Sequence, residues 1–170
     1  SIPVSTFMDH VDGQFEQGAA AYEKRGVAVL VPEWNADTCA KCNKCAFVCP
    51  HATIRPFALT EDEAAKAPAS TKFAAKPVMK TNYKFTMAIS PLDCMGCTLC
   101  VKTCPVTQNA AKTGKAPALE MKPIATQLDQ QPAYDYAVAK VSEKSELIGL
   151  SIKGSQFKQP LLEYSGSCAG

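Results

Sequence analysis

A chain of 170 residues is long enough for one or two domains. Its 18 basic and 16 acidic residues nearly cancel, which excludes the strongly basic surface that nucleic-acid-binding proteins use. No stretch approaches the roughly 18 consecutive apolar residues of a membrane-spanning helix, and the first residues lack the basic and apolar regions of a signal peptide.

The predicted elements of the first half follow a mixed polar segment. Gln14 to Arg25 favours a short helix that Gly26 ends. Val27 to Val31 is a β-branched apolar run, which predicts a strand, and Pro32 is expected to turn the chain after it. Ala52 to Arg55 is predicted to be a short return strand.

A long segment, residues 50–93, joins the two halves. Its middle, Glu61 to Lys80, is rich in Ala, Lys and Pro. Glu61 to Lys66 predicts one or two helical turns capped by Thr60, and the rest is expected to be extended surface loop. Two roles stay open for this segment: a tolerated insertion, and an arm that lies on a neighbouring domain.

The second half repeats the plan of the first. Apolar and polar residues alternate from Tyr83 to Ile89, which predicts a half-buried strand, and Leu119 to Ile124 is a candidate return strand. Tyr134 to Lys144 gives a weak helical signal, and Leu161 to Tyr164 is apolar. The last segment is predicted to connect to a following domain.

Eight of the nine cysteines form two runs of identical spacing. The runs are Cys39-x2-Cys42-x2-Cys45-x3-Cys49-Pro50 and Cys94-x2-Cys97-x2-Cys100-x3-Cys104-Pro105, offset by 55 positions (94 − 39). This spacing is typical of proteins that hold two 4Fe-4S clusters, in which the fourth cysteine of each run ligates the other cluster. We therefore predict crossed ligation, with cluster A on Cys39, Cys42, Cys45 and Cys104, and cluster B on Cys94, Cys97, Cys100 and Cys49.

The alternatives explain the cysteine pattern less well. A structural zinc site takes four ligands at two paired positions, which leaves the third cysteine and the Cys-Pro of each run without a role. A disulfide framework is typical of small secreted domains. Thiolate ligands must stay reduced, which favours the cytoplasm. The fold class predicted is α+β, a ferredoxin-like double 4Fe-4S domain with a long insertion and extended flanking arms.

Three parts of the chain are expected. Residues 1–26 are a connector from a preceding domain, residues 27–127 are the two-cluster domain, and residues 128–170 lead into a following domain. The chain begins at Ser1 and stops soon after a cysteine, without a closing element, so it is expected to be part of a longer protein.

Several motifs outside the cysteine spacing carry a resemblance to a known family. They are Tyr22-Glu-Lys-Arg25, Val31-Pro-Glu-Trp34, Cys49-Pro-His-Ala-Thr-Ile-Arg55, Ala67-Pro-Ala-Ser70 and Leu162-Glu-Tyr-Ser-Gly-Ser-Cys-Ala-Gly170. Over essentially its whole length the chain resembles the ferredoxin-like domain and flanking segments of pyruvate:ferredoxin oxidoreductase (pyruvate synthase). A stand-alone two-cluster ferredoxin-type electron carrier is the alternative.

The resemblance implies a function for the complete enzyme. That family decarboxylates pyruvate oxidatively to acetyl-CoA on thiamine pyrophosphate with Mg, and passes electrons through three 4Fe-4S clusters. Cys168 is implied to be one ligand of the third cluster, which is completed outside this chain. The implied partners are the remaining domains of the parent enzyme, itself a homodimer, and external ferredoxin or flavodoxin, with no nucleic acid and no membrane. The segment alone is expected to have no catalytic site.

Some residues near the cysteines carry open roles. Gly96 lets the backbone approach a cluster, whereas Lys41 at the matching position has less of that freedom. The lysines at 41, 44 and 102 are expected to favour the reduced state of a cluster, and Lys41 and Lys44 also to meet an acidic ferredoxin. The simpler alternative is that they are solvated surface lysines. His51 and Trp34 are expected to be packing residues rather than a proton or electron relay.

Overall fold

The computed structural model describes residues 2–14, 24–78 and 81–158. Within them the elements follow in this order: η1 (Val4–His10), β1 (Leu30–Trp34), α1 (Lys44–Phe47), β2 (Ile54–Leu59), α2 (Glu61–Ala65), β3 (Lys84–Ile89), α3 (Leu99–Thr103), α4 (Pro105–Thr113), β4 (Leu119–Pro123), η3 (Ile124–Thr126), α5 (Gln130–Lys140), η4 (Ser145–Leu147) and α6 (Ile152–Ser155). The helix expected from Gln14 to Arg25 and the apolar stretch Leu161 to Tyr164 lie mostly or wholly outside the described residues.

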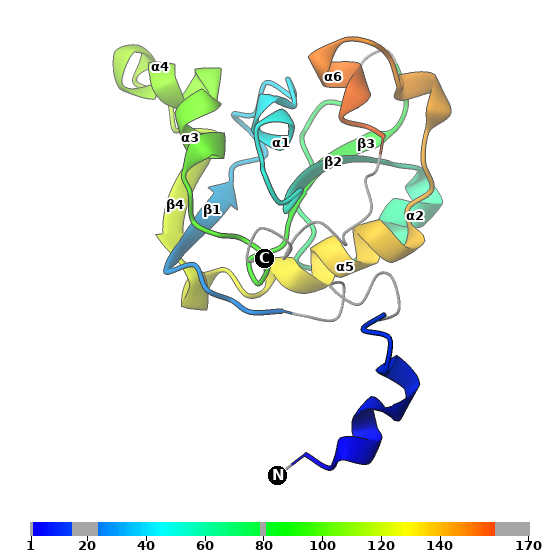
Figure 1. The fold of residues 1–170 in the computed structure, drawn as a ribbon. Coiled ribbons are helices and arrows are strands. Elements are labelled where there is room, and N and C mark those ends of the chain that lie inside the picture. Colours follow the sequence, from blue (N-terminus) through cyan, green and yellow to red (C-terminus); the bar gives the residue numbers. More distant parts are fainter. Residues whose placement is uncertain (1, 15–23, 79–80, 159–170) are drawn as a thin grey trace.

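Two antiparallel pairs of strands form the framework (Figure 1). In the first pair Leu30 of β1 stands opposite Pro123 of β4, and in the second Ile54 of β2 stands opposite Ile89 of β3. Each pair takes one strand from each half of the chain, so neither half completes a sheet by itself. The predicted order of strand, cysteine loop, short helix and strand is confirmed in both halves.

The position of β1 differs from the prediction. The strand begins at Leu30 rather than Val27 and runs through Pro32, which was expected to turn the chain. β1 pairs only with β4, and a strand with one partner tolerates Pro where no N–H is needed. Val31 is fully buried whereas Val29 is 80% exposed, so the pairing with β4, rather than β-branching, decides where the strand lies.

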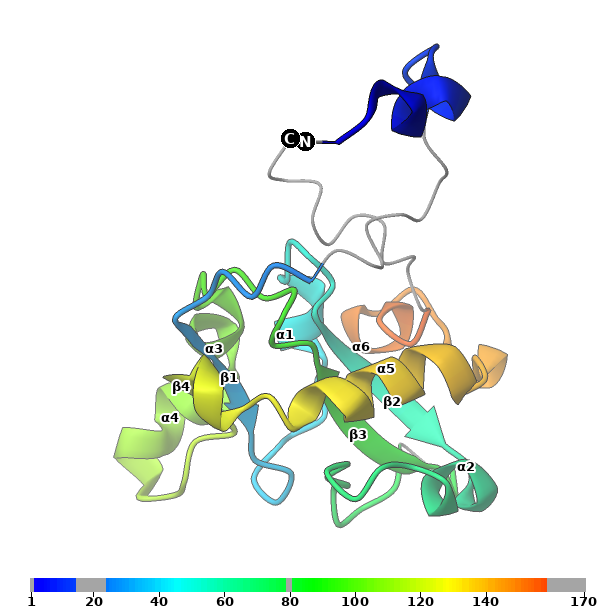
Figure 2. The same cartoon turned by 90° about the horizontal axis from the view of Figure 1, so that it is seen from below.

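The β2–β3 pair is buried on both faces, and the half-buried alternation expected for β3 is therefore wrong. Ile54, Phe85 and Ile89 face a core that also contains Cys45 and Cys104. Phe57 and Leu59 belong to a second core beneath α5, the helix that crosses this pair in Figure 2. Covering both faces fixes β2 and β3 as the centre of the domain.

The helix after Thr60 is confirmed, with its cap. The Thr60 side chain accepts a hydrogen bond from the Glu63 amide, and the Glu63 side chain accepts one from the Thr60 amide, which makes a capping box at the start of α2. The rest of the insertion folds back on the domain, because the amide of Ala74 bonds the carbonyl of Phe85 and Val78 is buried in the core.

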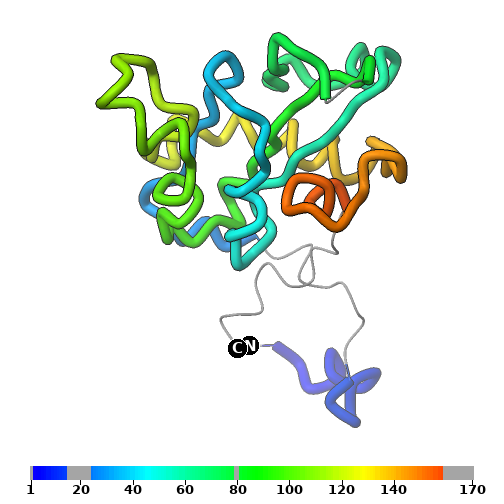
Figure 3. The backbone as a smooth tube through the Cα atoms, turned by 90° about the horizontal axis from the view of Figure 1, so that it is seen from above, coloured from blue at the N-terminus to red at the C-terminus, as the bar shows by residue number. Residues whose placement is uncertain are grey.

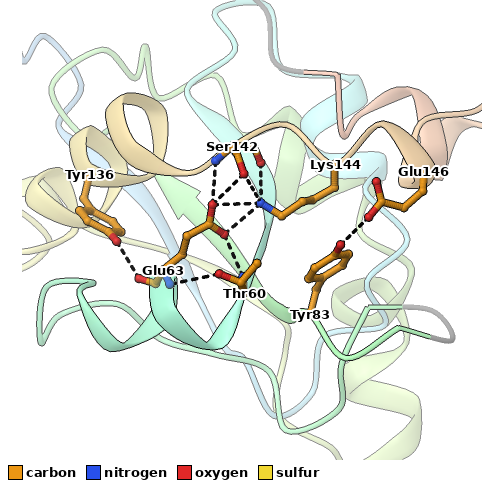
Figure 4. Close-up of polar contacts among 7 residues, drawn as sticks. All are labelled: Thr60, Glu63, Tyr83, Tyr136, Ser142, Lys144 and Glu146. Atoms are coloured by element: carbon orange, nitrogen blue, oxygen red, sulfur yellow. Dashed lines mark hydrogen bonds and ion pairs between the residues drawn. The ribbon is translucent and has the colours of Figure 1, made fainter.

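A polar network fastens α2 to the segment that follows α5 (Figure 4). The Glu63 carboxylate accepts hydrogen bonds from the Ser142 amide at 2.9 Å and from the Lys144 ammonium at 3.0 Å. The Tyr136 hydroxyl donates to the Glu63 carbonyl, and the Lys144 ammonium lies 5.6 Å from the centre of the Tyr83 ring. The described part of the insertion is thus held by its own chain.

Residues 128–158 pack on the same body. α5 begins four residues before the predicted Tyr134, and Tyr134 itself is fully buried with its hydroxyl bonded to the Ala52 carbonyl at 2.8 Å. Figures 2 and 3 show α6 beside α1 and the start of β2. There the Arg55 guanidinium bonds the Gln156 side chain and carbonyl and the Lys158 carbonyl, and Phe157 enters the core.

Two further findings complete the fold. α4 is absent from the elements predicted above; Pro105 occupies its first position, where the missing N–H costs nothing. In the described part of the chain, no helix has the length and apolar character needed to cross a membrane.

Candidate iron–sulfur centres

The first cysteine loop leaves the end of β1 and closes on α1. Two of its residues, Lys41 and Asn43, have left-handed backbone conformations, with φ of 53° and 61°. These turns bend the loop around a cavity with an open space of about 330 Å³. We call it cavity A; it is lined by four thiols, those of Cys39, Cys42, Cys45 and Cys104.

The second loop leaves β3 and closes on α3 in the same way. Gly96 and Thr98 have φ of 70° and 67°, at positions that correspond to Lys41 and Asn43. The loop bounds a cavity with an open space of about 370 Å³, which we call cavity B. The thiols that line it belong to Cys94, Cys97, Cys100 and Cys49. In each cavity the fourth cysteine therefore comes from the other loop.

The walls of the two cavities also correspond. Three further pairs of lining residues, one residue in each cavity, are 55 positions apart in the sequence (106 − 51, 87 − 32 and 95 − 40). Val106 of cavity A corresponds to His51 of cavity B, Met87 to Pro32, and Ala40 to Met95. The backbone is repeated while the side chains are not, so the two cavities offer the same ligand set in different surroundings.

The electrostatics of the thiols reflect the same grouping. Burial raises the pKa of Cys100 to about 12, and the charges of Cys49, Cys94 and Cys97 add to the rise. Burial likewise raises the pKa of Cys39; hydrogen bonds from the Trp34 side chain and the Lys41 amide offset part of this rise, and Cys42 and Cys104 add smaller rises. Thiols of this kind are protonated at neutral pH, and iron binding must release their protons because a thiolate is the ligand.

Backbone donors face both sets of sulfurs. The Lys41 amide donates to Sγ of Cys39 at 3.3 Å, and the Gly96 amide donates to Sγ of Cys94 at 3.4 Å. Cavity B has a further contact, of 3.4 Å, between Sγ of Cys49 and the Thr53 hydroxyl. Hydrogen bonds of this kind to ligand sulfurs tune the reduction potential of an iron–sulfur cluster.

The residues present fit a cluster better than a single ion. Both donor sets are four thiols, the set that a 4Fe-4S cluster requires. In the stretches that the structure describes, no three His, Cys, Asp or Glu side chains are grouped closely enough to hold one metal ion. Thiols that surround a cube must stand farther apart than those on one zinc ion at about 2.3 Å. The spacing of both runs, whose third cysteine and Cys-Pro have no role at a zinc site, favours clusters over zinc.

The structure distributes the other candidate residues unequally. His51 is buried and lines cavity B, and Trp34 is buried and lines cavity A. Lys44 and the lysine at 102 are exposed, whereas the Lys41 ammonium bonds the Lys76 carbonyl of the insertion at 3.1 Å. Lys41, which was expected to have less backbone freedom than Gly96, adopts the same left-handed conformation. Cys168 lies outside the described residues.

Two contacts near cavity B are new relative to the sequence prediction. The Lys24 ammonium pairs with the buried carboxylate of Asp93, the residue before Cys94, and Ser90 donates to the same carboxylate. The Gly26 amide bonds the Leu92 carbonyl at 2.8 Å. A lysine 69 residues before its partner gives no local signal of the pairing, whereas the Thr53 hydroxyl four residues after Cys49 was visible in the sequence.

Comparison with known proteins agrees with the geometry. Residues 38–108, which include both cysteine runs, match a family described as a 4Fe-4S dicluster domain. This segment is a 4Fe-4S dicluster domain. Residues 1–28 match a second family, described as a domain of unknown function.

Relatives match the chain from end to end. It is 45% identical over 171 residues to "Pyruvate-flavodoxin oxidoreductase" of Enterobacter agglomerans, covering 100% of the chain and 14% of the relative. It is 41% identical over 173 residues to "Pyruvate:ferredoxin oxidoreductase" of Moorella thermoacetica, covering 99% and 14%. It is 40% identical over 172 residues to "Pyruvate dehydrogenase [NADP(+)], mitochondrial" of Euglena gracilis, covering 99% and 9%.

The dicluster domain and its flanking segments are thus homologous to one segment of much longer oxidoreductases. The chain spans about one seventh of the length of the first two of these relatives. The resemblance drawn from the sequence motifs is confirmed at the level of this segment.

Proposed function

We propose that the chain is the electron-relay segment of a pyruvate:ferredoxin or pyruvate-flavodoxin oxidoreductase. The observation that carries the proposal is the pair of four-thiol cavities in a chain similar along its whole length to one segment of these enzymes. Each bound cluster supplies a reversible one-electron redox centre. Crossed ligation, with Cys104 on cluster A and Cys49 on cluster B, is part of the proposal.

The chain's own groups prepare the two centres for this role. Four of the eight ligand cysteines are buried, and the amides of Lys41 and Gly96 donate to one sulfur in each set. A donor directed at sulfur stabilises the more negative, reduced state without changing position during electron transfer. Cys97 is the exposed member of its set, which supports cluster B as the centre nearer to solvent.

The complete enzyme is proposed to contain what this segment lacks. In the proposal, thiamine pyrophosphate with Mg lies on other domains, and Cys168 gives one ligand to a third cluster completed there. Residues 1–26 and 128–170 lead to the neighbouring domains of the parent, with residues 128–158 also packing on the two-cluster domain, and the parent is a homodimer. External ferredoxin or flavodoxin receives the electrons in the cytoplasm, where thiolates stay reduced.

The test is made in the complete enzyme that contains this segment. Cys94→Ala removes one proposed ligand of cluster B and leaves the substrate site untouched. We expect decarboxylation at the first turnover to survive and steady-state reduction of ferredoxin to fall sharply. Lys112→Gln, on an exposed position late in α4, is the control and leaves both rates unchanged. Unchanged steady-state reduction in a Cys94→Ala enzyme shown to lack cluster B contradicts the proposal.

A further inference from the structure

Trp34 places an indole at the wall of cavity A. It ends β1, opposite Leu119 of β4, and is only 3% exposed. Its ring meets that of Phe85 edge-on, with the ring centres 5.9 Å apart and the planes at 65°. Cys39 lines the same cavity, and hydrogen bonding from the Trp34 side chain lowers the pKa of the Cys39 thiol, so the indole N–H is directed at this sulfur.

The indole N–H has no other use in the described structure. Nε1 of Trp34 is buried and makes no full hydrogen bond within the described residues, so its interaction with the neutral Cys39 thiol falls short of one. An indole can only donate, and leaving a buried donor unsatisfied is destabilising. The wall of cavity A holds the four thiols, and a neutral thiol is a weak acceptor, whereas a metal-bound thiolate carries negative charge and accepts more strongly.

Cavity B has no such donor at the matching position. The residue 55 positions after Trp34 (89 − 34) is Ile89, which is buried and cannot donate. The backbone donors, in contrast, are the same in both halves, through the amides of Lys41 and Gly96. The indole is therefore an addition to one cavity rather than a part of the repeated loop.

We propose that Trp34 donates its indole N–H to the Cys39 thiolate of bound cluster A and thereby raises the reduction potential of cluster A. The proposal rests on the ligation of cluster A by Cys39 that is proposed above. A hydrogen bond to a ligand sulfur offsets negative charge, so it stabilises the reduced cluster more than the oxidised one. Trp34 is thus a positioning residue that separates the potentials of two centres with identical ligands.

The first test compares potentials in the 170-residue chain carrying both clusters. Trp34→Phe keeps an aromatic ring against Phe85 and loses only the donor. We expect the reduction potential of cluster A to shift to a more negative value and that of cluster B to stay unchanged. A redox titration monitored by EPR measures both potentials. Phe85→Leu is the packing control: it disturbs the ring contact but keeps the indole, and we expect no comparable negative shift.

The second test needs no variant. Because Trp34 is the single tryptophan, nitrogen-15 labelling of tryptophan marks this residue alone. Pulsed EPR of the reduced protein should show the label coupled to a cluster through the hydrogen bond, and this measurement decides the matter if Trp34→Phe does not fold.

The outcomes separate this inference from the proposed function. Unchanged potentials in Trp34→Phe, equal shifts of both clusters, or an absent nitrogen-15 coupling in a chain with both clusters overturn the role of Trp34 and leave the relay function standing. A chain that takes up no 4Fe-4S cluster on the Cys39 set overturns both.

Discussion

The loop of Cys39 and the loop of Cys94 share a backbone but not an environment. Both turn through two left-handed residues and direct an amide at the first sulfur of the run. Cavity A is lined by Trp34 and Val106, whereas cavity B contains His51 and Thr53 and has an exposed ligand in Cys97. Spacing therefore specifies which cofactor is bound, while the surrounding side chains make its two copies inequivalent.

Removing both clusters should destabilise both halves of the domain, and this is the largest effect we expect. Cysteines of both sets belong to the apolar core of a small domain or pack against it, so ligation contributes folding free energy directly. In urea, the iron-free chain should unfold in a broad, weakly cooperative transition, which circular dichroism measures. A sharp two-state transition of iron-free protein contradicts this expectation.

Replacing the fourth cysteine of either run should remove one cluster and leave the other bound. Cys104→Ala should remove cluster A, the cluster of the Cys39 loop, and Cys49→Ala should remove cluster B, each halving iron and sulfide per chain. Because Cys97 is exposed, the cluster that survives in Cys104→Ala should be oxidised faster by air than the one that survives in Cys49→Ala. If Cys104→Ala spares the cluster of the Cys39 loop, ligation is not crossed.

Substitutions at the equivalent positions 41 and 96 should act in opposite directions. In Gly96→Ala the new Cβ lies 3.1 Å from the Leu30 carbonyl oxygen at a φ of 70°, so we expect a loss of about 1–2 kcal/mol in unfolding free energy. Lys41→Gly removes a left-handed non-glycine residue and should gain up to about 1 kcal/mol relative to Lys41→Ala. The Lys41→Ala variant controls for the lost ammonium contact with Lys76. Denaturant unfolding of the cluster-loaded protein measures all three, and equal losses at both positions would mean that the backbones are not equivalent.

The insertion has no counterpart in the second half of the chain. Substitution of Glu63 tests whether its polar network holds the insertion on the domain. Burial raises the pKa of this carboxyl, but hydrogen bonds from the Ser142 and Thr60 amides and from Lys144 outweigh it and lower the pKa to about 2, from 4.5. The stability from this network is complete above pH 4.5 and is lost as the pH falls towards 2. Glu63→Gln should cost about 1–2 kcal/mol at pH 7 and flatten that acid dependence.

A matched control lies on the same helix. Glu61 pairs with Lys84 at 2.8 Å, but its side chain is 74% exposed, so Glu61→Gln should change stability by less than about 0.5 kcal/mol. Thermal unfolding between pH 3 and 7 compares the two variants. Equal losses from Glu61→Gln and Glu63→Gln would show that the network in Figure 4 does not hold the insertion.

Local features were predictable from the sequence, and features that depend on distant partners were not. The Thr60 cap is decided within four residues, and it formed as predicted. The start of β1 depends on β4, about 90 residues later, and the burial of both faces of β3 depends on α5. The sequence could not indicate these contacts, because propensity says nothing about which strand or helix will cover a face.

The same division holds at the site. Spacing alone predicted two groups of four cysteines, each with one member from the opposite run. In the structure the four cysteines of each group line the same cavity. The direction of the Trp34 N–H and the pairing of Lys24 with Asp93 depend on packing across the domain. A tryptophan or lysine in the sequence carries no sign of either role.

The most direct test of crossed ligation is an anaerobic crystal structure with anomalous scattering recorded at the iron edge. We predict two separate iron peaks in each chain, one bounded by Cys39, Cys42, Cys45 and Cys104, and the other by Cys94, Cys97, Cys100 and Cys49. Iron density that joins Cys49 to the Cys39 loop, or a single metal ion in either cavity, would contradict the account.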